Sequence, residues 1–127
     1  LLEEIEDMAR SDLKACISYL AVILEHLYKW DNFRHLVGKE GGRGWIKSVN
    51  NARRSLEALL ESYPSLKAKL PNELHRAWIQ ARARVMNWLE FNDIEHENFH
   101  IPTECPYTYQ EALSRDLRKE LEDEERA

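Results

Sequence analysis

The residues best suited to proton chemistry lie in the first thirty positions of the chain. Asp12, Tyr19 and His26 follow one another at intervals of seven residues, or two helical turns, so a helix would place them along one flank. A carboxylate, a phenol and an imidazole aligned in this way are a candidate hydrogen-bonded chain or proton relay. We favour a plainer interpretation, a seam between packed helices whose polar groups satisfy one another. We expect His26 to be at least half buried and hydrogen-bonded.

A second candidate is a possible anion-binding face in the middle of the chain, made of Lys39, Arg43, Lys47 and Arg54. Residues 38–44, GKEGGRG, hold every glycine of the protein and precede a predicted helix. Exposed N–H groups and positive charge at such a place favour a phosphate. The segment lacks the preceding strand and the G-x-x-x-x-G-K-[ST] order of a nucleotide-binding loop. We therefore interpret residues 38–44 as a flexible connector.

A metal site is the third candidate, in EHENFH at residues 95–100, where His96 and His100 lie one helical turn apart. Zinc needs three or four protein ligands, and no further partner is evident. Glu97-x-x-His100 occurs once, whereas carboxylate-bridged di-iron bundles need such a pair twice. The sequence thus predicts no catalytic residue, no metal and no cofactor. An enzyme that uses the Asp12 flank stays open as an alternative, but we favour a protein without catalysis.

The segment PTECPYTYQEAL, residues 102–113, places Cys105 between two prolines. Proline disfavours helix in the residue before it, which predicts an extended strap lying across the helices, with the thiol as a small buried filler. Thr108 and Glu111 form a capping box, so a last helix should run from Tyr109 toward Glu122. The charged tail, residues 120–127, should fray.

Apolar residues at helical spacing predict the remaining elements. The stripes cover residues 2–27, 45–63 and 74–89, and no strand pattern is present. The expected fold is all-α, a bundle of three to four helices with the Pro-Cys-Pro strap before the last helix. Arg53 and Arg82 lie at the margins of their stripes, where we expect them to pair with acids of a neighbouring helix, such as Glu6 or Asp12.

Composition bounds the class of protein. With 127 residues, 43% of them hydrophobic, the chain predicts one helical domain, residues 1–127, with a core that needs no disulfides. Two cysteines and no apolar run of membrane-spanning length favour a cytoplasmic protein without membrane contact. The chain starts at Leu1 in helical pattern, so we expect it to lack an upstream N-terminal segment.

Charge is distributed unevenly along the chain, whose net charge is −5. Residues 1–30 carry −3, residues 31–86 carry +6 and residues 87–127 carry −8. Such blocks can pair internally, pair across an oligomer or bind an anionic partner. Internal or solvated charge is the interpretation that we favour.

Four segments together resemble a known family: EEIEDMARSD at 3–12, ILEHLYKW at 23–30, LLESYPSL at 59–66 and ECPYT at 104–108. In this order and spacing the chain resembles the bacterial domain of unknown function 29 family over almost its whole length. Ala9 stands where such proteins commonly have glycine, and Ile46 where a basic residue is common. The resemblance implies an all-helical bacterial protein, and it implies no activity or catalytic residue.

Two functions follow from these observations. The first is a protein–protein interaction module that binds a protein partner or itself, supported by separated charge blocks and a long apolar first helix. The alternative is binding of nucleic acid or another polyanion through the basic middle segment, which the acidic net charge disfavours.

Overall fold

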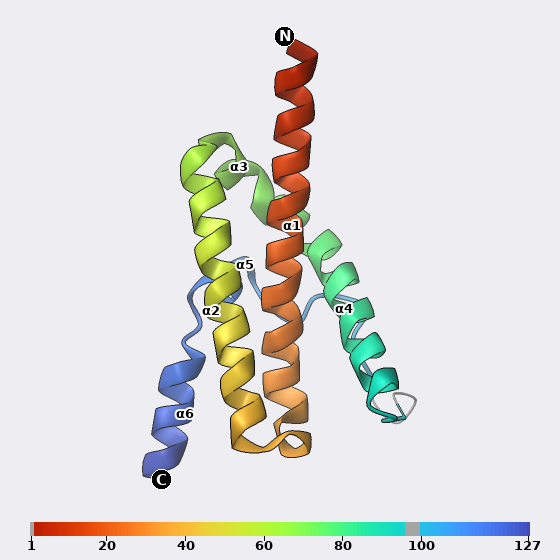
Figure 1. The fold of residues 1–127 in the computed structure, drawn as a ribbon, viewed down its shortest axis with the longest axis vertical. Coiled ribbons are helices and arrows are strands. Elements are labelled where there is room, and N and C mark those ends of the chain that lie inside the picture. The colour runs from red at the N-terminus through yellow and green to blue at the C-terminus, as the bar shows by residue number, and fades with distance from the viewer. Residues whose placement is uncertain (1, 96–99) are drawn as a thin grey trace.

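Three long helices form the body of the protein. The computed structural model describes residues 2–95 and 100–127, and for residues 2–9 only the course of the main chain. Helix α1 (Leu2–Phe33) packs against both α2 (Gly38–Ser62) and α4 (Leu74–Phe91) (Figure 1). The described residues form helices and connections without a strand. The predicted all-α fold is therefore confirmed.

The core lies where the predicted apolar stripes meet. Fully buried side chains come from α1, α2 and α4 alike, among them Leu20, Ile23, Leu27, Leu56, Trp78, Val85 and Leu89. Tyr63 departs from the predicted stripe, since it follows the last residue of α2 and its side chain is exposed. Helix α1 continues through Ser11 without a break, so its 32 residues span about 48 Å.

The prediction that residues 38–44 form a flexible connector is wrong. They are the first two turns of α2, and only a short 3-10 turn (Arg34–Leu36) and Val37 separate them from α1. Gly38 has φ +67°, which an L side chain rarely adopts. At Gly41 a Cβ atom would approach the Cβ of Val37 within 2.6 Å. These glycines permit a tight turn between two helices, which offsets their low helix propensity.

Short elements connect the long helices. Helix α3 (Pro64–Lys69) and a 3-10 turn (Leu70–Glu73) lead from α2 to α4. Pro64 is the first residue of α3, a position where its missing N–H costs nothing. Leu66 and Leu70 are buried in the core and fix this connection against α1 and α2.

The C-terminal part returns across the bundle. An irregular strap (residues 100–108) leads into α5 (Tyr109–Ser114) and α6 (Leu117–Arg126). The capping box of Thr108 and Glu111 is confirmed, but the single last helix is wrong. Arg115 and Asp116 are extended, and the Asp116 carboxylate accepts the Lys119 N–H as the N-cap of α6. Helix α6 continues to Arg126, and fraying of residues 120–127 stays a prediction.

Substitution of two glycines by alanine should change stability in opposite directions. At Gly38, alanine must adopt the left-handed region, and we expect a loss of about 1–2 kcal/mol in the free energy of unfolding. At Gly44, inside α2, an added Cβ meets nothing within 4 Å, and we expect a gain of about 0.5–1 kcal/mol. Urea denaturation measures both values. Equal effects of the two variants would contradict the turn geometry.

Candidate functional site

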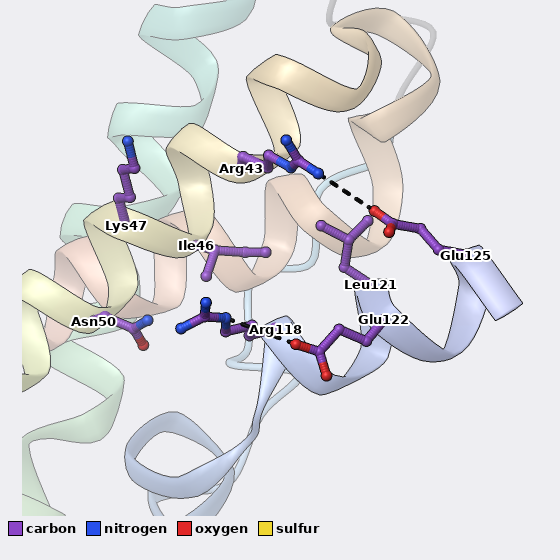
Figure 2. Close-up of a pocket in the computed structure, with 8 residues that line it drawn as sticks. All are labelled: Arg43, Ile46, Lys47, Asn50, Arg118, Leu121, Glu122 and Glu125. Atoms are coloured by element: carbon purple, nitrogen blue, oxygen red, sulfur yellow. Dashed lines mark ion pairs between the residues drawn. The ribbon is translucent and has the colours of Figure 1, made fainter.

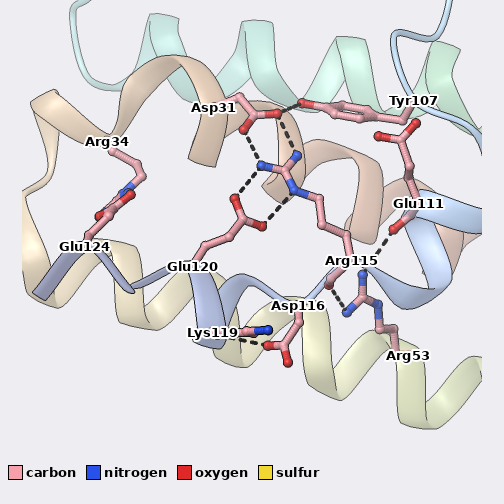
Figure 3. Close-up of polar contacts among 10 residues, drawn as sticks. All are labelled: Asp31, Arg34, Arg53, Tyr107, Glu111, Arg115, Asp116, Lys119, Glu120 and Glu124. Carbon is pink, nitrogen blue, oxygen red and sulfur yellow. Dashed lines mark hydrogen bonds and ion pairs between the residues drawn. The ribbon is translucent and has the colours of Figure 1, made fainter. Parts of the chain in front are cut away.

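A polar cluster joins the C-terminal part of the chain to α1 (Figure 3). Asp31 accepts hydrogen bonds from Arg115 Nη1 and Nη2 at 2.8 and 2.6 Å, and from the Tyr107 hydroxyl at 2.6 Å. Arg115 also donates to both carboxylate oxygens of Glu120 at 2.9 Å. One guanidinium thus links α1, the junction between α5 and α6, and α6 itself.

The electrostatics of this cluster favour one protonation state. Burial would raise the pKa of Asp31, but hydrogen bonds from Arg115 and Tyr107 outweigh it and lower that pKa. Burial, and then the hydrogen bond to Asp31, raise the pKa of the Tyr107 phenol. The hydrogen bonds to Asp31 and Glu120 raise the pKa of Arg115. Since these shifts keep each group in its usual charge state near neutral pH, the cluster is suited to fixing structure and not to moving protons.

Arg82 and Trp78, both on α4, hold the strap. The Trp78 indole N–H donates to the Pro102 carbonyl at 3.0 Å, and Arg82 Nε donates to the same oxygen at 3.1 Å. Arg82 Nη2 also donates to the Ile101 carbonyl at 3.3 Å. We predicted acidic partners for this arginine, whereas its described bonds to the strap go to main-chain oxygens.

Arg53 plays the equivalent part for α5. It donates to the carbonyls of Ala112 and Arg115 at 2.9 and 2.7 Å, at the C-terminal end of that helix. These carbonyls have no partner within α5. The predicted pairing with an acid such as Glu6 or Asp12 is again replaced by hydrogen bonds to main-chain oxygens.

The structure does not bring Asp12, Tyr19 and His26 together. All three lie on α1, and two helical turns of about 11 Å separate each from the next. His26 is 14% exposed and its Nδ1 donates to the Val22 carbonyl at 2.7 Å, as we expected. Burial is the main cause that lowers the His26 pKa. Its described hydrogen bond is therefore local to one turn of α1.

Sequence reasoning missed a buried ion pair one turn farther along. Lys29 Nζ lies 2.7 Å from Glu25 Oε2, and the two residues are only 4% and 8% exposed. The ammonium also lies 4.8 Å from the Trp88 ring centre and 6.0 Å from that of Trp45. The (i, i+4) spacing of Glu25 and Lys29 was a visible signal for the pair. Its burial among the tryptophans of α2 and α4 had no such signal.

The four residues of the possible anion-binding face differ in their surroundings. Lys39 and Arg43 lie 3.1 and 3.6 Å from Glu125 of α6. Arg43 and Lys47 line an open cleft of about 390 Å³ between α2 and α6 (Figure 2). Arg54 instead donates to the Asn51 side chain within α2.

Other candidate chemistry finds little support in the described residues. The described residues contain no group of three side chains that could hold a metal ion. Of the predicted candidates, His96 and Glu97 lie outside the described residues, and His100 is exposed. Both cysteines are free, and burial raises the pKa of each thiol. Among the described residues, no helix has the length and hydrophobicity needed to cross a membrane.

Comparison with known protein families shows to which family the chain belongs. Residues 1–117 match the family described as "Domain of unknown function DUF29". The chain belongs to the DUF29 family. The resemblance seen in its four sequence segments is therefore confirmed. No curated protein sequence and no solved structure matches it.

Removing the Asp31 charge should weaken this DUF29 chain in a pH-dependent way. We expect Asp31→Asn to lower the free energy of unfolding at pH 7 by about 1–2 kcal/mol, whereas Asp123→Asn on α6 should change it little. The Asp31 pKa is lower in the folded protein than its ordinary value of 3.8. The Asp31 charge therefore stabilises the folded protein above that pH, and this contribution is lost as the pH falls through the pKa of the folded state. Urea titrations from pH 7 to 2 should show the two curves converging. A pH-independent difference would contradict the cluster.

The buried pair offers a second test. Lys29→Met leaves the Glu25 carboxylate buried without its lysine, and we expect a loss of about 3 kcal/mol. The double variant Glu25→Leu, Lys29→Met removes both charges and should recover most of that loss. Urea denaturation of both variants gives the comparison. Arg84 Nη1 also lies 4.0 Å from Glu25 Oε1, so a double variant as unstable as the single one would show that packing of the lysine stem, and not the lost pairing of Glu25 with Lys29, causes the loss.

Proposed function

We propose that this chain is a protein–protein interaction module that associates with a second copy of itself through the N-terminal part of α1. The observation that carries the proposal is the length of that helix. Figure 1 shows the first turns of α1, in red, beyond the ends of α2, α3 and α4. A helix that extends past its neighbours offers a whole face to another molecule.

The sequence of this extension is suited to helix pairing. Leu2, Ile5, Ala9 and Leu13 recur at intervals of three and four residues. Helical register places them on the same face as Cys16 and Leu20, which are fully buried farther along α1. The apolar stripe of the core therefore continues into the extension. Two such stripes in antiparallel contact would cover each other.

Charge gives this association a characteristic salt dependence. Residues 2–12 hold five acidic residues and one basic residue, so two copies repel each other while their apolar stripes attract. Salt screens the repulsion over about 10 Å at 0.1 M and leaves the hydrophobic term. Self-association should therefore strengthen with salt, whereas binding to a polyanion weakens with salt.

Polyanion binding through the basic middle segment has less support. Lys39 and Arg43 already face Glu125 of α6. A nucleic acid on this face would have to compete with these carboxylates. No contact among the described residues favours that function, and we do not propose it.

A charged substitution in the stripe should weaken self-association. We expect Ile5→Glu to raise the dimer dissociation constant at least about 10-fold, because an isoleucine contributes roughly 1.5–3 kcal/mol when fully buried. Ser11→Glu adds the same charge on the opposite face and should have a much smaller effect. Sedimentation equilibrium of the full chain at low and high salt measures both. A chain that stays monomeric at millimolar concentration, or association that weakens with salt, would overturn the proposal.

A further inference from the structure

Helix α6 is held on the bundle by two buried leucines, by the pairing of Glu120 with Arg115, and by ion pairs near its C-terminal end. Leu117 and Leu121 are its buried side chains, and Leu121 lies beside Ile46 of α2 in Figure 2. Nearly all its other residues are charged and exposed. The extended residues Arg115 and Asp116 join it to α5. This helix thus resembles a docked ligand more than an element of the core.

Ion pairs complete the docking of α6. Arg34 Nη1 lies 2.6 Å from Glu124 Oε1, and Lys39 Nζ lies 3.1 Å from Glu125 Oε1 (Figure 3 shows the first pair). Arg43 adds a third contact to Glu125 at 3.6 Å. The hydrogen bonds from Arg34 and Lys39 lower the pKa of the two carboxyls. Because these groups are exposed, each pair contributes little alone and is weakened by salt.

The surface that α6 covers is formed by residues within the DUF29 match. The family match ends at residue 117, where α6 begins. We call this surface the basic groove, and define it by Arg34, Lys39, Arg43, Ile46, Lys47 and Asn50. Helix α6 fills it only in part, since the cleft of about 390 Å³ remains between α2 and α6. Within the described chain no ion pair of Lys47 is found, and this residue lines the cleft.

We propose that the basic groove is a docking site for an acidic amphipathic helix of a partner protein, and that α6 is its intramolecular occupant. The occupant defines the chemistry that the groove accepts. Leu117 and Leu121 supply apolar anchors at i and i+4, and Glu124 and Glu125 supply carboxylates at i+7 and i+8. An amphipathic helix with this spacing binds a groove by its anchors, while the charges set its orientation. A partner helix must displace α6, whose tether gives it a high effective concentration.

The test is a competition between α6 and the same helix in trans. The probe is a fluorescein-labelled peptide with the sequence of residues 116–127, and anisotropy reports its binding to the full chain. Leu121→Asp places a charge at the buried contact and should release α6. We expect the released chain to bind the peptide at least about 10-fold more tightly than the unmodified chain, because only an unoccupied groove is competent to bind.

Matched variants assign the binding to the groove. Arg43→Glu in the released chain should abolish binding, whereas Arg54→Glu, at a residue bonded within α2, should leave it within about 2-fold, as expected outside a contact. A peptide carrying E124Q and E125Q keeps the apolar anchors and should bind about 3- to 10-fold more weakly, because the ion pairs of both carboxylates are lost. Circular dichroism and thermal denaturation check the fold. If Leu121→Asp unfolds the bundle, the full chain with E124Q and E125Q replaces it as the released chain.

Three results would overturn the proposal. The first is a folded, released chain that does not bind the peptide. The second is equal binding by the unmodified and the released chain, which would place the peptide elsewhere. The third is tighter binding of a single-stranded oligothymidylate than of the peptide, which would make the groove a polyanion site. Self-association is tested with a substitution at Ile5, which lies outside the basic groove. The self-association proposal and the groove proposal can therefore fail independently of each other.

Discussion

Hydrogen bonds from side chains of the long helices to main-chain carbonyls determine where the C-terminal part of the protein lies. Residues 100–108 form no helix or strand, so their polar groups need partners other than their own backbone neighbours. Arg82 and Trp78 satisfy carbonyls of the strap, and Arg53 satisfies those at the end of α5. These donors stand on α2 and α4, which pack on α1. Correct packing of the three long helices is thus the condition for the strap, α5 and α6 to be placed.

Once α5 is in place, Arg115 comes within reach of Asp31. Its guanidinium binds that carboxylate on one side and Glu120 on the other, so α6 starts at a fixed point beside α2. The sequence near Asp31 also supplies the buried Lys29, which lies between tryptophans of the two neighbouring helices. The C-terminal end of α1 therefore organises both the core and the returning chain, while its N-terminal end extends beyond them (Figure 1).

Sequence patterns predicted the features that depend on local chemistry and missed those that depend on distant partners. Helical apolar spacing predicted the three long helices, and Thr108 with Glu111 predicted the start of α5. The glycines of residues 38–44 suggested a loop because glycine disfavours helix, yet a close turn after α1 required them inside α2. Asp116 looks like a residue within a helix, but it accepts an N–H as the N-cap of α6. The partners of Arg53 could not be predicted. Every residue has a main-chain carbonyl, so the sequence does not indicate which of them accepts a hydrogen bond from this side chain.

The charge blocks of the sequence acquire a physical meaning in this arrangement. Arg34, Lys39 and Arg43 from the basic middle face Glu124 and Glu125 from the acidic end, which is the internal pairing that we favoured. The opposite end of the long helix has acidic residues around an apolar stripe and no basic block beside it in the sequence. If two copies pair through α1 as proposed, salt would act in opposite directions on the two surfaces, since it would screen attraction at α6 and repulsion between the two copies of α1. Higher salt would then weaken the docking of α6 and strengthen the pairing of α1 within the same protein.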